Sequence, residues 1–311
     1  MGNYITVDGG TTNTRITVIC DGKIIDAVKF NVGIRNAINN KEILFNTIKE
    51  GIQNLLEKNS LCEDEIECII GCGMITSEFG LCHLEHINAP CGIRELSNGL
   101  FKTVIYDISP LPFAFIRGVK INTDFETADT MRGEETELFG ITDEIEKDCL
   151  YVLPGSHSKL IYTDDEGRIS HFSTELTGEL ISAVANNTIL KDIIELSQNE
   201  TDSEFLQKGY LYTKQYGINA ALFKTRTLKL FFECDKKQLF SFFLGSVLTA
   251  EIENIIKSNA LKVIIGGKHQ LKAPMATLLK INSDKCVVTI PDIVSEYATA
   301  FGCVRIYENN R

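Results

Sequence analysis

The residues best suited to chemistry stand near the start of the chain, where a β-branched run ends in an acid, two glycines and two hydroxyls. Their order is Asp8-Gly9-Gly10-Thr11-Thr12. Glycines let backbone N–H groups approach a phosphate closely, hydroxyls donate hydrogen bonds, and a carboxylate holds a divalent metal, often through water. The pattern indicates a phosphate-binding turn with Asp8 as metal anchor, although an ordinary hairpin turn at Asp8-Gly9 would use the same residue types.

A similar unit occurs in the second half of the chain. The apolar run 150–153 leads into the turn Pro154-Gly155-Ser156-His157-Ser158-Lys159, and shifting the first unit by 144 positions places residues 12–16 over 156–160. Each turn is followed by a second hairpin of nearly equal length, at residues 21–22 and 166–167. Similarity over five residues arises easily by chance, but the shared order of strand, loop and hairpin predicts a duplicated architecture with two phosphate loops. Residues 155–157 form the second loop.

Two further turns follow buried strands. Gly266-Gly267 lies between the apolar run 261–265 and a helical pattern at 271–280, which is typical of a nucleotide cradle and also of a plain turn. Residues 73–78 follow a short buried strand at 67–70. Because ligands bind at the carboxyl ends of strands in layered folds, Met74 and Ser77 are candidate substrate contacts, although a plain strand-to-helix connection is equally consistent.

A charged motif stands at Met131-Arg132-Gly133-Glu134-Glu135-Thr136. Acidic residues suit the first turn of a helix because they complement its dipole. The plain interpretation is a charged helix start that faces water, with Arg132 in a surface salt bridge to Glu134 or Glu135. The functional interpretation is that Arg132 pairs with an anionic group of a substrate.

Hydrophobic periodicity predicts the elements that position these motifs. It indicates an α/β chain in which strands precede the turns and helices separate them. We expect Pro110 and Pro112 to mark a loop, 197–221 to be a polar stretch broken at Gly209 and Gly217, and a closing helix with small residues that permit close packing. The expected helices are one of about 17 residues that includes 43–56, one at 239–257 and one that begins at 295. The expected strands cover 4–8, 16–20, 23–30, 102–108, 113–121, 160–162, 168–172 and 286–290.

Composition limits the class of protein. A chain of 311 residues suits two domains, and 44% hydrophobic with 23% charged residues is ordinary for a soluble globular protein. The net charge of −11 argues against nucleic-acid binding. No apolar run approaches the roughly 20 residues that span a bilayer, and no secretion signal is apparent, so we expect a cytoplasmic protein without membrane partners.

The ten cysteines are scattered and are expected to be reduced core thiols. Cys82, His83, His86 and Cys91 are the one place where metal-ligand types gather. Their spacing fits no usual zinc pattern.

The ordered set of motifs resembles the sugar kinases of the actin, Hsp70 and sugar-kinase superfamily. Those proteins have two ribonuclease-H-like domains, each a mixed sheet flanked by helices, with ATP between them. Their phosphate loops are similar to 8–12 and 155–158, and their adenosine loop to Gly266-Gly267. The resemblance implies an N-terminal domain at 1–140 and a C-terminal domain at 141–311.

Within that superfamily the chain is most similar to the 2-dehydro-3-deoxygalactonokinases. The similarity rests on Met131 to Thr136, the turn 151–157 and Thr177-Gly178-Glu179-Leu180. A departure is Gly9, where that family usually has a tryptophan. The resemblance implies transfer of the ATP γ-phosphate to the terminal (C6) hydroxyl of 2-dehydro-3-deoxy-D-galactonate, with ATP and Mg²⁺ bound, in galactonate catabolism.

The resemblance also implies roles for single residues. Glu134 is the expected general base, with Asp8 as metal anchor and competing base, and Arg132 as partner of the substrate carboxylate or the transferred phosphoryl group. ATP is expected to contact the first loop at Gly9, Gly10, Thr11, Thr12 and Arg15, the second at Gly155, Ser156 and His157, and the third at Gly266 and Gly267. The sugar acid is expected to contact Asn13, Met74, Ser77 and Arg132. Of Arg15 and Lys159, which follow the two loops, we expect at least one to be structural.

Other functions fit parts of the sequence. The acceptor could instead be 2-keto-3-deoxygluconate, another sugar or pantothenate, whose type III kinases open with a similar motif. A non-kinase ATP-driven switch of the actin or Hsp70 type is the alternative from another class. The chain lacks the long insertions or peptide-binding domain that such switches use.

Overall fold

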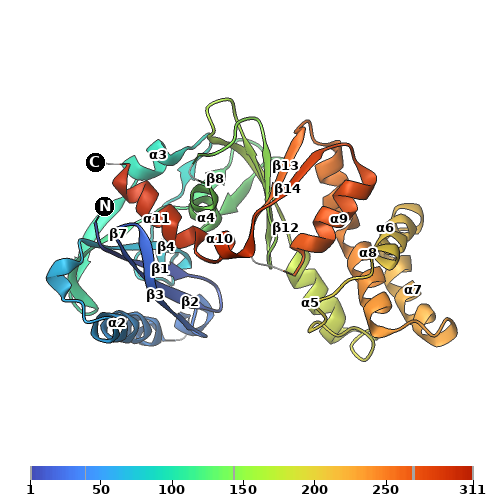
Figure 1. The fold of residues 1–311 in the computed structure, drawn as a ribbon, viewed down its shortest axis with the longest axis horizontal. Coiled ribbons are helices and arrows are strands. Elements are labelled where there is room, and N and C mark those ends of the chain that lie inside the picture. The colour runs from blue at the N-terminus through green and yellow to red at the C-terminus, as the bar shows by residue number, and fades with distance from the viewer. Residues whose placement is uncertain (1, 39, 143, 268–269, 310–311) are drawn as a thin grey trace. The chain divides into compact units, whose positions relative to one another are not determined.

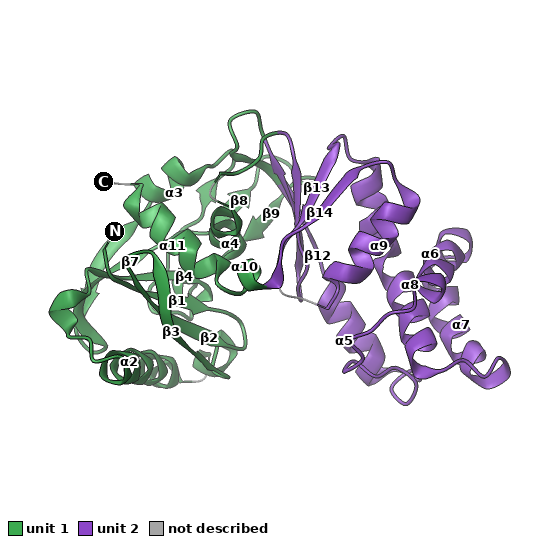
Figure 2. Ribbon diagram, viewed as in Figure 1, with its two compact units in different colours: residues 1–147, 164–171, 293–311 green, residues 148–163, 172–292 purple. Residues whose placement is uncertain are grey.

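The computed structural model describes residues 2–38, 40–142, 144–267 and 270–309. The chain forms two compact units (Figure 2). Unit 1 comprises Met1–Lys147, Asp164–His171 and Ile293–Arg311, and unit 2 comprises Asp148–Thr163 and Phe172–Asp292. The predicted border at residues 140 and 141 lies near the first crossing at 147 and 148. The C-terminal helix returns to unit 1.

Unit 1 is built on a six-stranded sheet of order β3-β2-β1-β4-β7-β6. Strands β1 and β4 are parallel, and β2 and β3 continue antiparallel from β1 through hairpins. The tight turn at Asp21-Gly22 has φ values of 49° and 74°, as a type I′ hairpin requires. The strands are β1 (Tyr4–Gly9), β2 (Thr14–Cys20), β3 (Lys23–Phe30), β4 (Cys68–Gly73), β6 (Phe101–Ile105) and β7 (Ser109–Phe115), and a separate three-stranded sheet contains β5 (Ile87–Asn88), β8 (Val119–Ile121) and β9 (Asp129–Met131).

Helices cover both faces of the larger sheet in unit 1 (Figure 1). The predicted first long helix is α2 (Lys41–Lys58), which packs its apolar stripe on β2 and β3, while α4 (Glu134–Ile141) and α11 (Ala298–Glu308) lie on the other face. Small residues bring α4 and α11 together as predicted, because a Cβ at Gly302 would lie only 1.9 Å from the carbonyl oxygen of Thr136. The shorter helices are α1 (Ile34–Ala37), η1 (Glu63–Glu65), η2 (Met74–Thr76), α3 (Ile93–Asn98) and α10 (Asp292–Glu296).

Unit 2 repeats the strand order of unit 1. Its sheet runs β12-β11-β10-β13-β14, with β10 antiparallel to β11 and parallel to β13. The strands are β10 (Leu150–Leu153), β11 (Ser158–Thr163), β12 (Ile169–Glu175), β13 (Lys262–Ile265) and β14 (Cys286–Thr289). The repeated order confirms the predicted duplicated α/β fold.

The helices of unit 2 bury one large apolar core around α8 (Lys236–Lys257). The most apolar 18-residue window of α8 is long and apolar enough to cross a membrane, but 78% of it is buried in the unit, as in the core helix of a globular domain. A long helix was predicted here, but the prediction that it is amphipathic was wrong, because α8 is buried on almost all sides. The others are α5 (Thr177–Asn187), α6 (Ser203–Tyr216), α7 (Ile218–Phe231) and α9 (Lys272–Asn282).

Two expectations about loops were wrong. Pro110 and Pro112 lie inside β7, ahead of the residues from Phe113 onward that pair with β4, so their missing N–H groups cost the sheet no bond to that neighbour. The stretch 197–221 contains all of α6 and the start of α7. Only Gly217 divides two helices, whereas Gly209 lies within α6 where it packs against α8.

Candidate active site

The parallel pair β1 and β4 brings Asp8 next to residues 73–78 of unit 1, the candidate substrate loop. Asp8 is opposite Cys72, and Gly9 is opposite Gly73, at the carboxyl ends of both strands. Gly73 has a φ of 73°, and a Cβ there would lie 2.5 Å from the carbonyl oxygen of Gly9 and 3.3 Å from Oδ1 of Asp8. Only glycine fits this crossing, so the chain passes directly beside the carboxylate.

The predicted first phosphate loop is a tight turn anchored at its base. The backbone N–H of Gly10 donates to the carbonyl oxygen of Asn13 at 2.8 Å. Carbonyl oxygens of Gly10 and Thr11 accept from the first N–H groups of α1, at 3.1 Å each. Thr11 and Thr12 are exposed, and the amide of Asn13 donates to the Thr12 hydroxyl at 3.0 Å. The backbone of the loop is therefore fixed by hydrogen bonds to its own turn and to α1, while Thr11 and Thr12 are exposed to solvent.

The Arg132–Glu134 turn lies against the same place. Gly133 caps α4 with a φ of 115°, and a Cβ there would lie 3.3 Å from Cα of Gly73. One oxygen of Glu134, Oε2, accepts from the backbone N–H of Arg132 at 3.0 Å. Asp8, Gly73 and Gly133 thus follow one another in space, although 125 positions separate Asp8 from Gly133 in sequence. Unit 1 therefore brings together the first loop, the candidate substrate loop and the acidic turn.

Carboxylates crowd this region. Burial raises the pKa of Asp8 to about 6, with a further rise from the charge of Glu134, while Arg15 opposes it. Burial also raises the pKa of Glu137 to about 8, with Glu134 and Asp8 adding to the rise. Glu135 is fully buried, and its pKa rises to about 7 from burial and then from Glu134. A bound divalent cation would relieve this accumulation of negative charge.

The interpretation of the acidic motif as a helix start facing water was wrong. Glu135 has no exposed surface, and it accepts two hydrogen bonds from the backbone N–H of Gly133, at 3.0 and 2.8 Å, and one from the Thr136 hydroxyl at 2.9 Å. Glu137 was missed by sequence reasoning. It follows Glu134 by three positions, which places both on one helix face, and that spacing is the signal that could have identified it.

Arg132 holds the candidate substrate loop. Its Nη1 donates to the carbonyl oxygen and hydroxyl of Thr76 at 2.7 and 2.6 Å, and its Nη2 donates to the carbonyl oxygen of Leu84 at 3.0 Å. Among the described residues these partners, rather than a surface salt bridge to Glu134 or Glu135, engage the guanidinium. Direct contact of Arg132 with a substrate stays a prediction.

The four residues Cys82, His83, His86 and Cys91 have different surroundings. Nδ1 of His86 lies 3.2 Å from Nη2 of Arg132, and its Nε2 lies 2.9 Å from the Thr130 hydroxyl. Burial lowers the pKa of His86 to about 4, and the charge of Arg132 lowers it further, so the ring is neutral at pH 7 and Nδ1 can accept from Arg132. The backbone of Cys91 pairs with Ile169, while Cys82 and His83 lie on the preceding loop.

The other predicted residues of unit 1 lie around this region. Met74 packs partly buried against the apolar core of the unit, and the hydroxyl of Ser77 donates to the carbonyl oxygen of Met74 at 2.7 Å. Arg15 is opposite Asp8 in the β1–β2 register, donates to the carbonyl oxygen of Glu296 and lies over the ring of Tyr297, 6.0 Å from its centre. Arg15 therefore links the first strand pair to the C-terminal segment.

The predicted second phosphate loop occupies the matching place in unit 2. The backbone N–H of Gly155 points to the Ser158 hydroxyl at 3.5 Å, and His157 Nε2 lies 3.3 Å from Oε1 of Glu179 in α5. A Cβ at Gly178 would lie 2.5 Å from the carbonyl oxygen of Gly155, so the loop rests directly on the first turn of α5. Lys159 is buried and donates to the Thr174 hydroxyl at 2.7 Å, which confirms that it is structural.

The predicted adenosine loop lies beside the second phosphate loop within unit 2. The backbone N–H of Gly266 donates to the carbonyl oxygen of Val152 at 2.9 Å, just before the loop begins, and Gly267 has a φ of 73°. The next two residues, 268–269, lie outside the described residues. Both glycine turns of unit 2 are therefore at the carboxyl ends of parallel strands, as Asp8 and Gly73 are in unit 1.

The residues near Asp8 suit Mg²⁺ in the way that kinases use it. Within the described part of the chain, no three His, Cys, Asp or Glu side chains could hold a metal ion by themselves. Mg²⁺ normally takes one or two protein carboxylates, keeps several waters and completes its shell with substrate phosphates. Asp8, half-buried beside other carboxylates and an exposed threonine loop, fits that arrangement.

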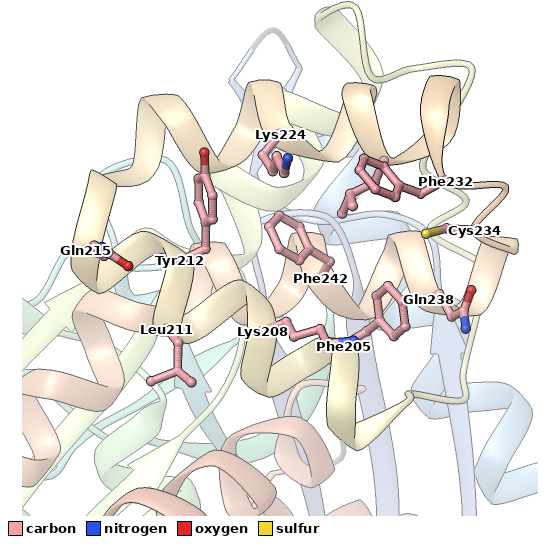
Figure 3. A pocket seen from close by; sticks show the side chains of 11 residues that line it. Phe205, Lys208, Leu211, Tyr212, Gln215, Lys224, Phe232, Cys234, Gln238 and Phe242 are labelled. Atoms are coloured by element: carbon pink, nitrogen blue, oxygen red, sulfur yellow. The ribbon is translucent and has the colours of Figure 1, made fainter.

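A separate hollow of about 640 Å³ lies in the helical part of unit 2 (Figure 3). Aromatic side chains from α6 and α8, together with Phe232 after α7, form much of its wall, and Lys208 and Lys224 lie on its sides. Its lining contains none of the residues that the sequence predicts to bind ATP or sugar acid.

Comparison with known proteins identifies a matching family and two curated relatives. The family model described as 2-keto-3-deoxy-galactonokinase matches residues 8–303. The chain is 30% identical over 197 residues to a probable 2-dehydro-3-deoxygalactonokinase of Rhizobium meliloti, an alignment that covers 62% of this chain and 60% of the relative. It is 25% identical over 254 residues to the 2-dehydro-3-deoxygalactonokinase of Escherichia coli, covering 81% of this chain and 80% of the relative.

A solved structure shares the fold. The crystal structure of a Sinorhizobium meliloti protein, described as a putative 2-dehydro-3-deoxygalactonokinase, superposes with a TM-score of 0.80 at 22% identity. The superposition covers 97% of this chain and 95% of the other. The match confirms the two-domain α/β fold.

Proposed function

The chain belongs to the 2-keto-3-deoxy-galactonokinase family, and we propose that it transfers the γ-phosphate of ATP to the C6 hydroxyl of 2-dehydro-3-deoxy-D-galactonate. The products are the 6-phosphate and ADP, in a step of galactonate catabolism. The names of the Rhizobium meliloti and Escherichia coli relatives support this acceptor. ATP and the sugar acid are then the partners of the protein, and a cytoplasmic location suits a metabolic kinase of this family.

One observation carries the proposal: the first phosphate loop and the Arg132–Glu134 turn meet at Gly73. A Cβ at Gly73 would lie 3.3 Å from Oδ1 of Asp8, and a Cβ at Gly133 would lie 3.3 Å from Gly73 itself. A kinase needs a metal-anchoring carboxylate and a base for the acceptor within one site. These two close approaches support candidates for both roles within unit 1.

Glu134 is the base in this proposal. The acceptor hydroxyl gives its proton to the Glu134 carboxylate as its oxygen forms a bond to the γ-phosphorus, and the bond between that phosphorus and the bridging oxygen of ADP breaks. The backbone N–H of Arg132 holds Oε2 of Glu134 at 3.0 Å and so orients the carboxylate. Asp8 is the alternative base, because its pKa of about 6 leaves it mostly ionised at pH 7 and able to accept a proton.

The remaining residues position the two substrates. Asp8 would hold Mg²⁺ through water, and the metal when bound neutralises phosphate charge. Gly9, Gly10, Thr11 and Thr12 would cradle phosphates, with Arg15 behind them. In unit 2 Gly155, Ser156 and His157 would contact phosphates, and Gly266 with Gly267 the adenosine. Asn13, Met74 and Ser77 would line the sugar-acid site, and Arg132 holds the loop that carries Met74 and Ser77.

The test is an ADP-release assay across acceptors. We expect substrate-stimulated ADP release with 2-dehydro-3-deoxy-D-galactonate and a much lower kcat/KM with 2-keto-3-deoxygluconate, aldoses and pantothenate. Glu134→Gln should lose nearly all turnover while retaining ATP affinity, because the amide cannot accept the proton. Asp8→Asn should instead change the dependence of turnover on Mg²⁺.

Three results would contradict parts of this proposal. Unchanged turnover in Glu134→Gln would move the base to Asp8. A metal dependence of Asp8→Asn equal to that of the wild type would remove Asp8 as metal anchor. ADP release stimulated by pantothenate or an aldose, or by no acceptor at all, would refute the assigned reaction.

A further inference from the structure

A buried carboxyl group lies behind the second phosphate loop of unit 2. Glu251 of α8 is 2% exposed, and its Oε2 accepts a hydrogen bond from the Thr177 hydroxyl at 2.6 Å. The Ser158 hydroxyl also hydrogen-bonds to this side chain. Its other oxygen, Oε1, is buried and has no hydrogen-bond partner among the described residues.

The two partners of Glu251 stand at the two sides of the loop. Ser158 ends the turn that begins at Gly155, whose backbone N–H points to the Ser158 hydroxyl at 3.5 Å. Thr177 opens α5, and the following turn of that helix rests on the loop, with the backbone N–H of Glu179 donating to the carbonyl oxygen of Ser156 at 3.1 Å. One carboxyl group of α8 therefore contacts both the end of the loop and the start of the helix on which the loop rests.

Stability alone does not account for a carboxyl group at this position. The surrounding core of unit 2 is built from leucine, isoleucine, valine and phenylalanine. A buried polar oxygen without a partner lowers stability, and an apolar side chain of similar size would avoid that loss. A side chain that destabilises its own core is a sign of a functional requirement.

The charges around Glu251 favour its neutral form. Burial raises the pKa of Glu251 to about 7, and the hydrogen bonds from Thr177 and Ser158 oppose this rise. Glu175 adds a negative charge nearby and is bound by Asn254 at 2.9 Å. Lys159, which follows Ser158 in sequence, is buried and donates to the Thr174 hydroxyl, while His157 of the loop pairs with Glu179 of α5.

We propose that Glu251 is a positioning residue of the nucleotide site, which fixes the second phosphate loop and the start of α5 and binds a proton when nucleotide phosphate arrives. The proposal rests on the proposed function, which assigns that loop to ATP. The negative charge of a phosphate in the loop disfavours an ionised carboxylate behind it. The pKa of Glu251 therefore rises on binding, and near pH 7.5 the complex takes up protons through this side chain.

The experiment measures ATP binding by titration calorimetry at pH 7.5 in buffers of different ionisation enthalpy, in the presence of Mg²⁺. Glu251→Gln keeps an oxygen that accepts from Thr177 but cannot bind the proton. We expect it to bind ATP within about threefold of the wild type and to lose most of the proton uptake. Glu251→Ala loses both hydrogen bonds, and its Kd for ATP should rise at least about tenfold.

A matched control lies on the same helix. Glu253, two positions on, pairs with Lys214 at 2.8 Å, and Lys214 belongs to α6 rather than to the loop. Glu253→Gln should leave both the ATP affinity and the proton uptake of the wild type unchanged. Binding of the sugar acid, whose predicted contacts are in unit 1, should be unchanged in every one of these variants.

Either of two outcomes would overturn the proposal. One is wild-type proton uptake in Glu251→Gln, which decides the question even where Glu251→Ala fails to fold. The other is a wild-type Kd for ATP in a folded Glu251→Ala, which would make the carboxyl group merely structural. A wild-type protein that binds ATP but phosphorylates no acceptor would refute the proposed reaction and leave the role of Glu251 in ATP binding standing.

Discussion

Nη1 of Arg132 donates hydrogen bonds to both oxygen atoms of Thr76, at 2.7 Å to the carbonyl and 2.6 Å to the hydroxyl. With Nη2 bound to the carbonyl oxygen of Leu84, a single guanidinium fixes two points of the segment that follows β4. The residue beside the candidate base therefore also shapes the candidate substrate loop. The turn that carries the candidate base and the candidate substrate loop are therefore linked through the side chain of Arg132.

Arg132→Lys should separate charge from geometry. Lysine keeps the positive charge but cannot reach Thr76 and Leu84 together, because it lacks the planar fork. We expect kcat/KM for the sugar acid to fall about 100-fold, which corresponds to about 2.7 kcal/mol, with ATP affinity nearly unchanged. Steady-state kinetics with each substrate varied will measure this. Thr76→Val, which removes only the hydrogen bond to the hydroxyl, should lower kcat/KM for the sugar acid by less. A rise in the KM for ATP as large as the fall in kcat/KM for the sugar acid would refute the assignment.

Gly133→Ala should damage the site through the backbone. The φ of 115° is strained for any L side chain, and a Cβ there would also make a tight contact of 3.3 Å with Cα of Gly73. Strain of this kind costs about 1–3 kcal/mol, so we expect a lower free energy of unfolding together with a large loss of kcat. Urea unfolding and turnover measurements test this. Gly155→Ala is the stability control, because a Cβ there meets only backbone atoms of His157 at 3.8 Å or more.

Glu137→Gln should stabilise the protein at alkaline pH. The pKa of Glu137 is raised from 4.5 to about 8, so the folded state holds the proton more tightly than the unfolded chain does. The stability associated with this proton is complete below pH 4.5 and is lost as the pH rises through 8. Because the side chain is partly solvated, we expect a gain of about 1–3 kcal/mol for the variant at pH 8.

Chemical unfolding at several pH values checks this expectation. Glutamine cannot ionise, so wild type and variant should have similar stability near pH 4.5 and diverge above it. A stability difference that does not depend on pH would show that Glu137 does not titrate as described. Glu179→Gln, on the partly exposed first turn of α5, is the control for replacing a glutamate in the first turn of a helix.

The parts of the fold that local sequence determines were predicted well. β3 has the predicted bounds, Asp21-Gly22 makes the predicted turn, and the repeated strand order follows from the two similar turns. Such features depend on neighbours within a few residues, where glycine, β-branched residues and hydrophobic period are direct signals.

The features that were missed depend on partners far away in the sequence. Arg132 acts on Thr76 and Leu84, about 50 positions earlier, and Glu251 acts on Thr177, 74 positions earlier. No local pattern reports such contacts. Gly209 was read as a break because glycine is a poor helix former, whereas it lies inside α6 because α8 leaves no room for a side chain there.

Gly209→Ala should therefore destabilise unit 2 although alanine favours helices. A Cβ at Gly209 would lie 2.1 Å from the carbonyl oxygen of Phe242 in α8. A Cβ at Gly245 of α8 would likewise lie 2.0 Å from the carbonyl oxygen of Leu206 in α6. The helix preference of alanine contributes about 1 kcal/mol, whereas separating two packed backbones costs more than this. We expect a net loss of about 1–3 kcal/mol in the free energy of unfolding, measured by urea denaturation. Gln215→Ala, at an exposed position of the same helix, should change it by less than about 0.5 kcal/mol, and equal stability of Gly209→Ala and wild type would contradict the close packing of α6 on α8.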